Sequence, residues 1–169
     1  MKQLSLFNLT HTPIAWSLYV DGASRNNPGA AGAGIYLIKE QEAVVKTGVY
    51  LGIKTNNQAE YMALLLGLLY AQKYMHANDT LAVKSDSQLI VRQLSGHYAV
   101  KHPELKKLFK HVVALLPHTY KVCHIPREEN AIADKLANMG IDKKIPIPEE
   151  FLQQWSLYEQ SVQAISTTI

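Results

Sequence analysis

The sequence is poor in several features that would place it in a specialised class of protein. One cysteine in 169 residues, Cys123, excludes an internal disulfide framework and favours a reducing compartment, the cytoplasm. No apolar run is long enough to span a bilayer. The N-terminal segment also lacks the uninterrupted apolar stretch of a secretion signal. What remains is a chain that is 47% hydrophobic, which predicts a globular domain with a substantial core.

The charge balance is mildly basic, with 17 Lys and Arg residues, 14 Asp and Glu residues and a net charge of +3. Contacts from Lys and Arg to phosphates release condensed counterions, so a basic surface suits a polyanionic partner. An excess of this size is common among ordinary domains. The charge therefore permits a nucleic-acid partner without identifying one.

Alternation of apolar and polar residues, together with capping residues, predicts the order of helices and strands. Three strands come first, followed by a helix, a strand, two helices, a strand and a helix. This order favours an α/β fold with a central mixed sheet and helices on its faces. The predicted strands are Trp16–Val20, Ala33–Ile38, Ala43–Tyr50, Leu81–Ser85 and Tyr120–Ile125, and the predicted helices begin at Asn57, Ser87, Pro103 and Asn130 and end near Met75, Leu94, Leu116 and Met139.

The two ends of the chain differ in character from its centre. Residues 1–14 form a poorly specified lead-in, residues 15–140 the predicted catalytic domain, and residues 141–169 a proline-bearing linker followed by an amphipathic helix. Apolar residues in this last segment recur at spacings of four and three, as expected of a helix with one buried face. We expect it to dock on its own domain, and self-association is the alternative. The residues that define this face are Phe151, Trp155, Tyr158, Val162 and Ile165.

Four acidic residues stand out because small or amide residues surround each of them. They are Asp21 in YVDGASRNNPG, Glu60 in TNNQAEYMALLLGL, Asp86 in VKSDSQLIVRQL and Asp134 in ENAIADKLAN. Each has an ordinary explanation when taken alone: a turn, a capping box with Asn57, a helix N-cap and a first-turn acid. Together they suggest one site for hard cations, because Mg²⁺ is bound by oxygen ligands. The sequence therefore predicts a metal-dependent phosphoryl-transfer site.

Four segments in this order resemble a type 1 ribonuclease H, of the compact prokaryotic and plant-like branch that lacks the basic protrusion. The segments are YVDGASRNNPGAAGAG, TNNQAEYMALLLGL, SDSQLIVRQLSGHYAVKHPEL and IPREENAIADKLAN, and the resemblance runs from Ser17 to Gly140. The resemblance implies a three-layer ribonuclease H-like fold. Its five-stranded sheet would have three antiparallel strands followed by two parallel ones, with helices on both faces.

The resemblance also implies an activity and its residues. The chain would be an endoribonuclease that hydrolyses the RNA strand of RNA–DNA hybrids and leaves 3′-hydroxyl and 5′-phosphate ends. Asp21, Glu60, Asp86 and Asp134 would be catalytic and would bind two Mg²⁺ ions, for which Mn²⁺ is a substitute. The residues expected to bind substrate are Gly22, Ala23, Ser24, Asn27, Thr55, Asn56, Asn57 and Gln58, joined by Arg127 as a guanidinium able to hold a phosphate.

Two departures from the family pattern leave alternatives open. Members with a long loop before the last acid carry a histidine there, whereas this chain has only PREEN, and we expect His124 to be a packing or sheet-surface residue. The basic protrusion is also replaced by SGHYAVKHPEL, in which Tyr98, Lys101 and His102 are candidates for contact with nucleic acid. A nuclease that also acts on double-stranded RNA and a non-catalytic hybrid-binding module are the alternative functions. A monomer is expected, with dimerisation through the C-terminal helix as the alternative.

Overall fold

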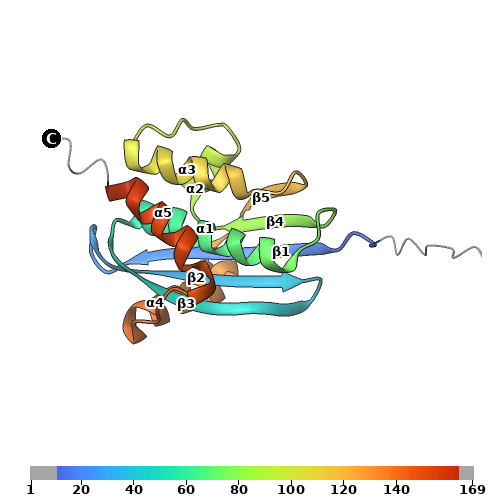
Figure 1. Ribbon diagram of the computed structural model, residues 1–169, viewed down its shortest axis with the longest axis horizontal. Coiled ribbons are helices and arrows are strands. Elements are labelled where there is room, and N and C mark those ends of the chain that lie inside the picture. The colour runs from blue at the N-terminus through green and yellow to red at the C-terminus, as the bar shows by residue number, and fades with distance from the viewer. Residues whose placement is uncertain (1–10, 164–169) are drawn as a thin grey trace, which may run out of the picture.

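Five strands and the helices between them follow one another in the predicted order (Figure 1). The computed structural model describes residues 11–163. The strands are β1 Ala15–Ser24, β2 Gly29–Lys39, β3 Glu42–Lys54, β4 Thr80–Ser85 and β5 Tyr120–His124. The helices are α1 Asn56–Tyr74, α2 Gln88–Leu94, α3 Pro103–Leu115, α4 Ala131–Lys143 and α5 Leu152–Gln163, with short 3₁₀ turns η1 Arg127–Asn130 and η2 Glu149–Phe151.

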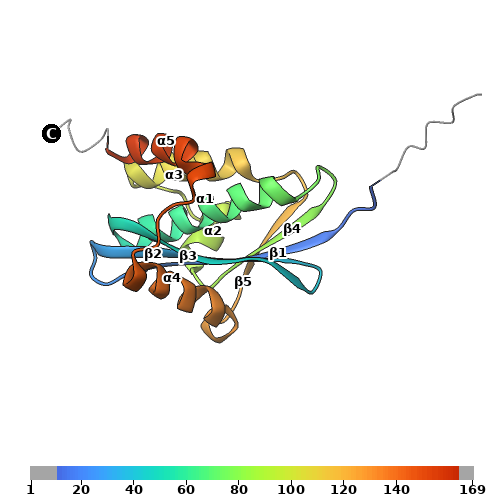
Figure 2. The same cartoon turned by 60° about the horizontal axis from the view of Figure 1, so that its bottom comes forward.

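The strands form one mixed sheet in the order β3-β2-β1-β4-β5. Strands β1, β2 and β3 are antiparallel, and β4 and β5 run parallel to β1. Helices α1, α3 and α5 cover one face of the sheet, and α4 covers the other (Figure 2). This arrangement confirms the predicted three-layer fold.

The first hairpin is longer than the sequence predicted. Strand β1 continues through Ser24, where its pairing with β2 reaches Ala31, and only residues 25–28 form the connection. The prediction that a long loop begins after Asp21 was therefore wrong. Glycine and alanine dominate this part of β2, and small residues there allow helix α4 to lie close to the sheet. A Cβ added at Gly34 would lie 1.9 Å from the carbonyl oxygen of Ala133 in α4.

The N-cap of helix α1 is Thr55, two residues before the predicted N-cap, Asn57. The Thr55 hydroxyl accepts a hydrogen bond from the backbone N–H of Gln58, and the Gln58 side chain accepts one from the Thr55 N–H. This is a capping box in which glutamine takes the third helical position. The capping box that the sequence allowed between Asn57 and Glu60 is absent. Glu60 is consequently not needed to cap the helix.

The central helix α1 is apolar on almost every side because it is buried on almost every side. Its residues from Gln58 to Ala71 are buried except for Glu60, and many of them are leucines with no exposed surface. Among the described residues, no helix has the length and hydropathy needed to cross a membrane. Burial between the sheet, α3 and the tail accounts for the composition of α1.

Asp79 is a buried charge that anchors the start of β1 to the turn before β4. Its carboxylate accepts hydrogen bonds from the Ile14 N–H, the Trp16 indole and the His76 N–H at 2.9, 2.9 and 3.0 Å. The His11 ring lies 2.6 Å from the same carboxylate. Burial alone would raise the pKa of Asp79, but these hydrogen bonds outweigh burial and lower it.

The C-terminal segment also departs from its predicted boundaries. Helix α4 runs to Lys143, past the predicted end near Met139, and the linker is correspondingly shorter. Phe151, Trp155 and Tyr158 belong to the same hydrophobic core as the sheet, and the Phe151 ring meets Tyr70 of α1 edge-on at 4.8 Å. The side chain of Val162, and Ile165 altogether, lie outside the described residues.

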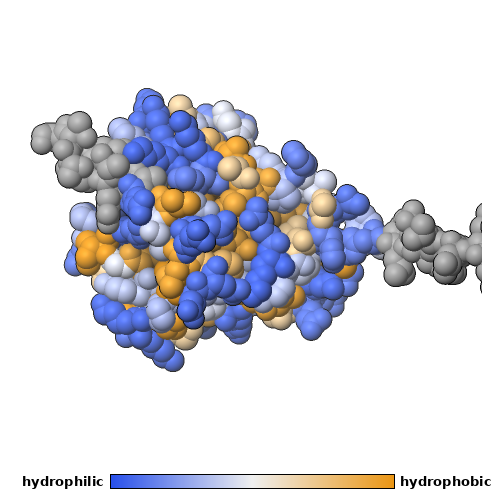
Figure 3. Space-filling view, in the orientation of Figure 1, coloured by the Kyte–Doolittle hydropathy of each residue, from blue (hydrophilic) through white to orange (hydrophobic). Residues whose placement is uncertain are grey.

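Helix α5 therefore docks on its own domain, in the way expected of its apolar spacing. Its polar side carries Glu159, whose carboxylate lies 3.0 Å from the Lys54 ammonium at the end of β3. Leu152 and Leu157 of this helix remain exposed. Figure 3 shows apolar patches lying between polar ones on one face of the molecule. A dimer formed through the aromatic face would require this helix to leave its own core.

Replacing Trp155 with alanine should destabilise the whole domain, because its indole is only 5% exposed. We expect a loss of roughly 3–5 kcal/mol in the free energy of unfolding, measured by denaturant titration. Leu157→Ala is the matched control in the same helix, because Leu157 is 58% exposed, and it should change stability by less than about 0.5 kcal/mol. Equal losses for the two variants would show that α5 does not dock as described.

Candidate metal-dependent active site

Parallel pairing of β1 with β4 brings two of the four predicted acids together. The register pairs Tyr19 with Lys84, so Asp21 and Asp86, each two residues further on, reach adjacent positions at the same edge of the sheet. Neighbouring strands lie roughly 5 Å apart, which places the two carboxylates within strong mutual influence. Asp21 is buried at 7% exposure, and Asp86 follows directly after the end of β4.

Glu60 joins this edge because helix α1 starts against the backbone of Gly22. A Cβ at residue 22 would lie 2.2 Å from the backbone of Ala59 and Glu60, so only glycine permits this approach. The Glu60 carboxylate accepts a hydrogen bond from the Gly22 N–H at 3.2 Å. Close packing of one helix end therefore fixes Glu60 beside Asp21.

Asp134 approaches from the opposite face of the sheet, in the first turn of α4. Its carboxylate is partly exposed and lies 3.1 Å from the Arg127 guanidinium, which is 79% exposed. Arg127 was predicted to bind substrate, and the structure places it on the rim of the acidic site. To hold a phosphate, the Arg127 guanidinium would have to bind it alongside Asp134 or break its ion pair with Asp134.

The acids influence one another electrostatically, as one site requires. Burial, followed by the negative charges of Asp86 and Asp134, raises the pKa of Asp21 to about 7, although Arg127 opposes the rise. Burial likewise raises the pKa of Glu60 well above its ordinary value, assisted by Asp21 and Asp86. Carboxylates that resist ionisation in this way are typical of functional sites.

Asn130 is a residue of this site that the sequence interpretation treated only as a helix cap. Its side chain is 1% exposed, and its amide nitrogen donates to the carbonyl oxygen of Val20 at 2.9 Å and to a carboxylate oxygen of Asp86 at 2.7 Å. It makes no capping hydrogen bond to α4. Asn130 therefore connects the ends of β1 and β4 to the helix that carries Asp134. The sequence gives no signal for this role beyond the position of Asn130, four residues before Asp134.

The amide oxygen of Asn130 is the one buried side-chain polar atom, among the described residues, that has no hydrogen-bond partner. Turning the amide over would set this oxygen against two other acceptors, so the orientation given is the favourable one. A buried acceptor without a partner next to an acidic site is a ligand-facing feature that calls for a cation or an ordered water.

The donor set fits a hard divalent cation, since all four predicted ligands offer carboxylate oxygens. Within residues 11–163, no three His, Cys, Asp or Glu side chains are oriented closely enough to surround one ion as they stand. A cation would have to draw them together, and the backbone positions already bring them to one edge of the sheet.

The predicted substrate-binding residues lie beside the acids at the same end of the sheet, in the β1–β2 connection and at the start of α1. Asn27 and Asn56 are exposed, and the Asn27 side chain accepts a hydrogen bond from the Asn56 N–H at 3.0 Å, which joins the two segments. Asn57 is also exposed. The Ser24 hydroxyl donates to the Lys54 carbonyl at 2.9 Å and so ties β1 to the end of β3. Gly22 and Ala23 are partly buried within β1.

Thr55 and Gln58, in contrast, already have partners. Both take part in the capping box of α1, and the Gln58 amide also donates to Glu104 of α3 at 2.5 Å. Gln58 is buried at 9% exposure. The structure thus places Gln58 where it supports the substrate-facing loop, and direct contact with nucleic acid would require it to leave these partners.

The PREEN segment folds into η1, which leads directly into α4. His124 lies just before it, at the end of β5, and is exposed. Its ring Nε2 lies 3.2 Å from the Asp86 carbonyl oxygen. His124 is therefore a sheet-surface residue, one of the two positions predicted for it, because β5 is an edge strand with few neighbours to cover it.

Comparison with known proteins agrees with this geometry. The sequence model of the family described as "Reverse transcriptase-like" matches residues 19–140. A bifunctional protein of Mycobacterium tuberculosis is 40% identical over 126 residues, which cover 72% of this chain and 34% of that protein. The chain therefore spans about a third of the length of this relative. A ribonuclease H of Coxiella burnetii is 33% identical over 144 residues, covering 75% of this chain and 89% of that protein.

Among solved structures, the crystal structure of LC11-RNase H1 in complex with an RNA/DNA hybrid has a TM-score of 0.70 and 38% sequence identity. The match covers 76% of this chain and 97% of that one. The family match over residues 19–140 contains all four acids and both predicted substrate-binding segments. On the evidence of fold, site geometry and sequence, the chain belongs to the ribonuclease H family.

Proposed function

We propose that this protein is an endoribonuclease that hydrolyses the RNA strand of RNA–DNA hybrids and leaves 3′-hydroxyl and 5′-phosphate ends. The observation that carries the proposal is the meeting of Asp21, Glu60 and Asp86 at one edge of the sheet, with Asp134 electrostatically coupled to them from α4. The solved relative bound to an RNA/DNA hybrid supports hybrid as the substrate class. The complete acidic set argues against a module that only binds.

We assign two divalent cations, Mg²⁺ with Mn²⁺ as a substitute, to Asp21, Glu60, Asp86 and Asp134. When bound, such ions supply a nucleophile from water and stabilise the attacking and leaving oxygens of a phosphodiester. The protein's own contribution is to hold four carboxyl groups close together at one edge of the sheet. Asn130 orients Asp86, the Gly22 N–H orients Glu60, and Arg127 offsets the negative charge near Asp134.

Selection of the RNA strand falls to the exposed amides of Asn27, Asn56 and Asn57 and to the backbone of Gly22–Ser24. A 2′-hydroxyl both donates and accepts hydrogen bonds, and amide side chains can satisfy both. DNA offers no such group at that position.

Residues 15–140 are proposed as the catalytic unit, with residues 141–169 as a stabilising tail and residues 1–14 as a lead-in. The single Cys123 fits a monomeric protein of the cytoplasm.

The proposal is tested by incubating the purified protein with end-labelled RNA–DNA, RNA–RNA and DNA–DNA duplexes of one sequence, with Mg²⁺ and with Mn²⁺. Cleavage confined to the RNA strand of the hybrid is the expected result. Equal cleavage of RNA–RNA would favour the broader double-stranded RNA nuclease. Binding to hybrid without cleavage in either metal would leave a binding module and overturn the proposal.

Asp86→Asn should abolish turnover while hybrid binding survives. The substitution keeps the shape of the side chain and its backbone contacts but removes the negative charge that a cation needs. We expect kcat to fall by at least about 10²-fold, with the Kd for hybrid changed by less than about threefold. A variant that cleaves hybrid near the parental rate would show that Asp86 is not a metal ligand.

Activity should rise with pH through neutrality, because Asp21 has a pKa of about 7 and must lose its proton to bind a cation. Below this pH the proton competes with the cation, and above it the carboxylate is free. The midpoint of the pH–rate profile should therefore move to lower pH as Mg²⁺ concentration increases. A midpoint that is independent of Mg²⁺ concentration would contradict this competition.

Asn130→Ala should raise the Mg²⁺ concentration needed for half-maximal activity, by roughly 10-fold or more. The variant loses both hydrogen bonds of the amide, which should also cost about 1–3 kcal/mol of stability. Asn138→Ala is the control in the same helix, because the Asn138 amide bonds only locally, to the Asp134 carbonyl oxygen. If Asn130→Ala loses stability but needs the same Mg²⁺ concentration as the parent, Asn130 stabilises the fold and does not affect cation binding.

A further inference from the structure

A surface hollow of about 420 Å³ lies between the C-terminal part of α2 and the end of β5. It is separate from the four carboxylates and from the β1–β2 connection. No acidic side chain lines it, and most of the lining groups are hydrogen-bond donors or are able to donate. The lining residues are Gln88, Val91, Arg92, Ser95, His97 and His124.

Arg92 is held in place at this hollow although it is exposed. Its guanidinium donates a hydrogen bond to the Tyr98 hydroxyl and lies 5.0 Å from the centre of the Tyr98 ring. The turn that carries Tyr98 is itself fixed, because the N–H groups of His97 and Tyr98 both donate to the Arg92 carbonyl at 2.8 and 3.0 Å. Gly96 has a φ of +76°, which glycine adopts without strain and which closes this turn.

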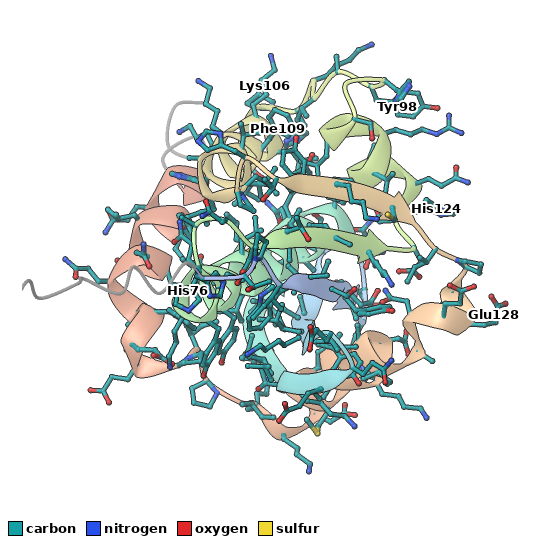
Figure 4. All side chains as sticks on the ribbon, turned by 90° about the vertical axis from the view of Figure 1, so that its right-hand side faces the viewer. His76, Tyr98, Lys106, Phe109, His124 and Glu128 are labelled. Atoms are coloured by element: carbon teal, nitrogen blue, oxygen red, sulfur yellow. The ribbon has the colours of Figure 1, made fainter. Side chains whose placement is uncertain are left out.

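The hollow adjoins the acidic site through two residues. Gln88 stands two positions after Asp86, and the His124 ring touches the Asp86 carbonyl oxygen at 3.2 Å. Tyr98, His124 and Glu128 of η1 follow one another down the right-hand edge of the molecule in Figure 4. A nucleic acid seated on the acids would therefore pass over or beside this hollow.

We propose that the hollow binds a backbone phosphate of the hybrid close to the scissile one, with Arg92 as the charged ligand. Gln88, Ser95, His97 and His124 supply further donors. A guanidinium can hold two phosphate oxygens at once, and its attachment to Tyr98 reduces the side-chain entropy lost on binding. The inference rests on the proposed function, because it names where that same site holds its substrate.

The charge distribution of the chain favours a phosphate over other occupants. The overall excess of +3 is small, and the segment 95–102 that replaces a basic protrusion contains a single lysine, Lys101. A hollow lined by donors, with a guanidinium already held in place, provides one strong phosphate contact. This contact would take the place of the several lysines that a basic protrusion would supply. The lining contains one aliphatic side chain, Val91, which is too little apolar surface to favour a hydrophobic peptide.

The test measures hybrid affinity in EDTA by fluorescence anisotropy, over a range of salt concentrations, so that no cleavage occurs. Arg92→Ala should weaken binding by roughly 3–10-fold and lower the slope of log Kd against log salt by about one, as expected for one lost phosphate contact. In Mg²⁺ it should raise KM with kcat nearly unchanged. Lys46→Ala removes one exposed charge from β3 near the opposite edge of the sheet and should leave Kd and slope at parental values.

Tyr98→Phe gives a second, independent reading because it keeps the ring and removes only the hydroxyl that holds Arg92. It should weaken hybrid binding less than Arg92→Ala and leave the salt slope unchanged. An Arg92→Ala protein that folds, and binds hybrid with the parental Kd and slope, would overturn this inference alone, provided that the parent cleaves hybrid. A parent that neither binds nor cleaves hybrid would overturn the proposed function, and this inference with it.

Discussion

Mutual repulsion among carboxylates that meet at one edge of the sheet is the constraint on which the rest of this structure depends. Asp21 and Asp86 face each other because β1 and β4 run parallel, and a parallel pair brings the carboxyl ends of both strands to one edge. Glu60 and Asp134 reach the same place from opposite faces because glycines let α1 and α4 approach the sheet backbone closely. Any looser packing of either helix would relieve the repulsion and disperse the site.

Holding these charges together costs stability, and the surrounding structure offsets that cost. The raised pKa of Asp21 corresponds to a penalty on the order of 4 kcal/mol for ionising this carboxyl in the folded protein. The folded state is therefore more stable at low pH, where Asp21 is protonated, than at high pH, where it is ionised. The hydrophobic core offsets this loss of stability. It includes the almost fully buried α1 and the aromatic face of α5. Asp79, tied to four groups around the start of β1, secures the other end of the strand that carries Asp21.

Local sequence patterns were sufficient to predict most of this architecture. Apolar alternation and capping residues predicted the order of strands and helices, and the small residues around the four acids pointed to one site. The predicted boundaries were wrong where two residues were equally suited to cap a helix, or where contacts with residues distant in the sequence determined how far a strand extends. Thr55 and Asn57 are both good N-caps, and only the reach of the Gln58 side chain selects Thr55. Strand β1 extends through Ser24 because β2 pairs with it there and α1 packs against Gly22, and no local pattern reveals either contact.

Asn130 and Arg92 illustrate what lies beyond such patterns. In the sequence, Asn130 marks the start of a helix, and no local pattern singles out Arg92. The role of Asn130 depends on its hydrogen bonds to Val20 and Asp86, which are far away in the sequence. The role of Arg92 depends on the turn that brings Tyr98 against its guanidinium. Three-dimensional proximity at the sheet edge, rather than residue type, makes them part of the site.

The most direct measurement of the central claim is the melting temperature of the parent and of Asp86→Asn at pH 8, each with EDTA and with Mg²⁺. If four repelling carboxylates form one cation site, Asp86→Asn in EDTA should melt above the parent, by about 2–4 °C for each kcal/mol of repulsion removed. Mg²⁺ should raise the melting temperature of the parent and have little effect on the variant. Equal melting temperatures in EDTA, or equal stabilisation of both proteins by Mg²⁺, would contradict the account.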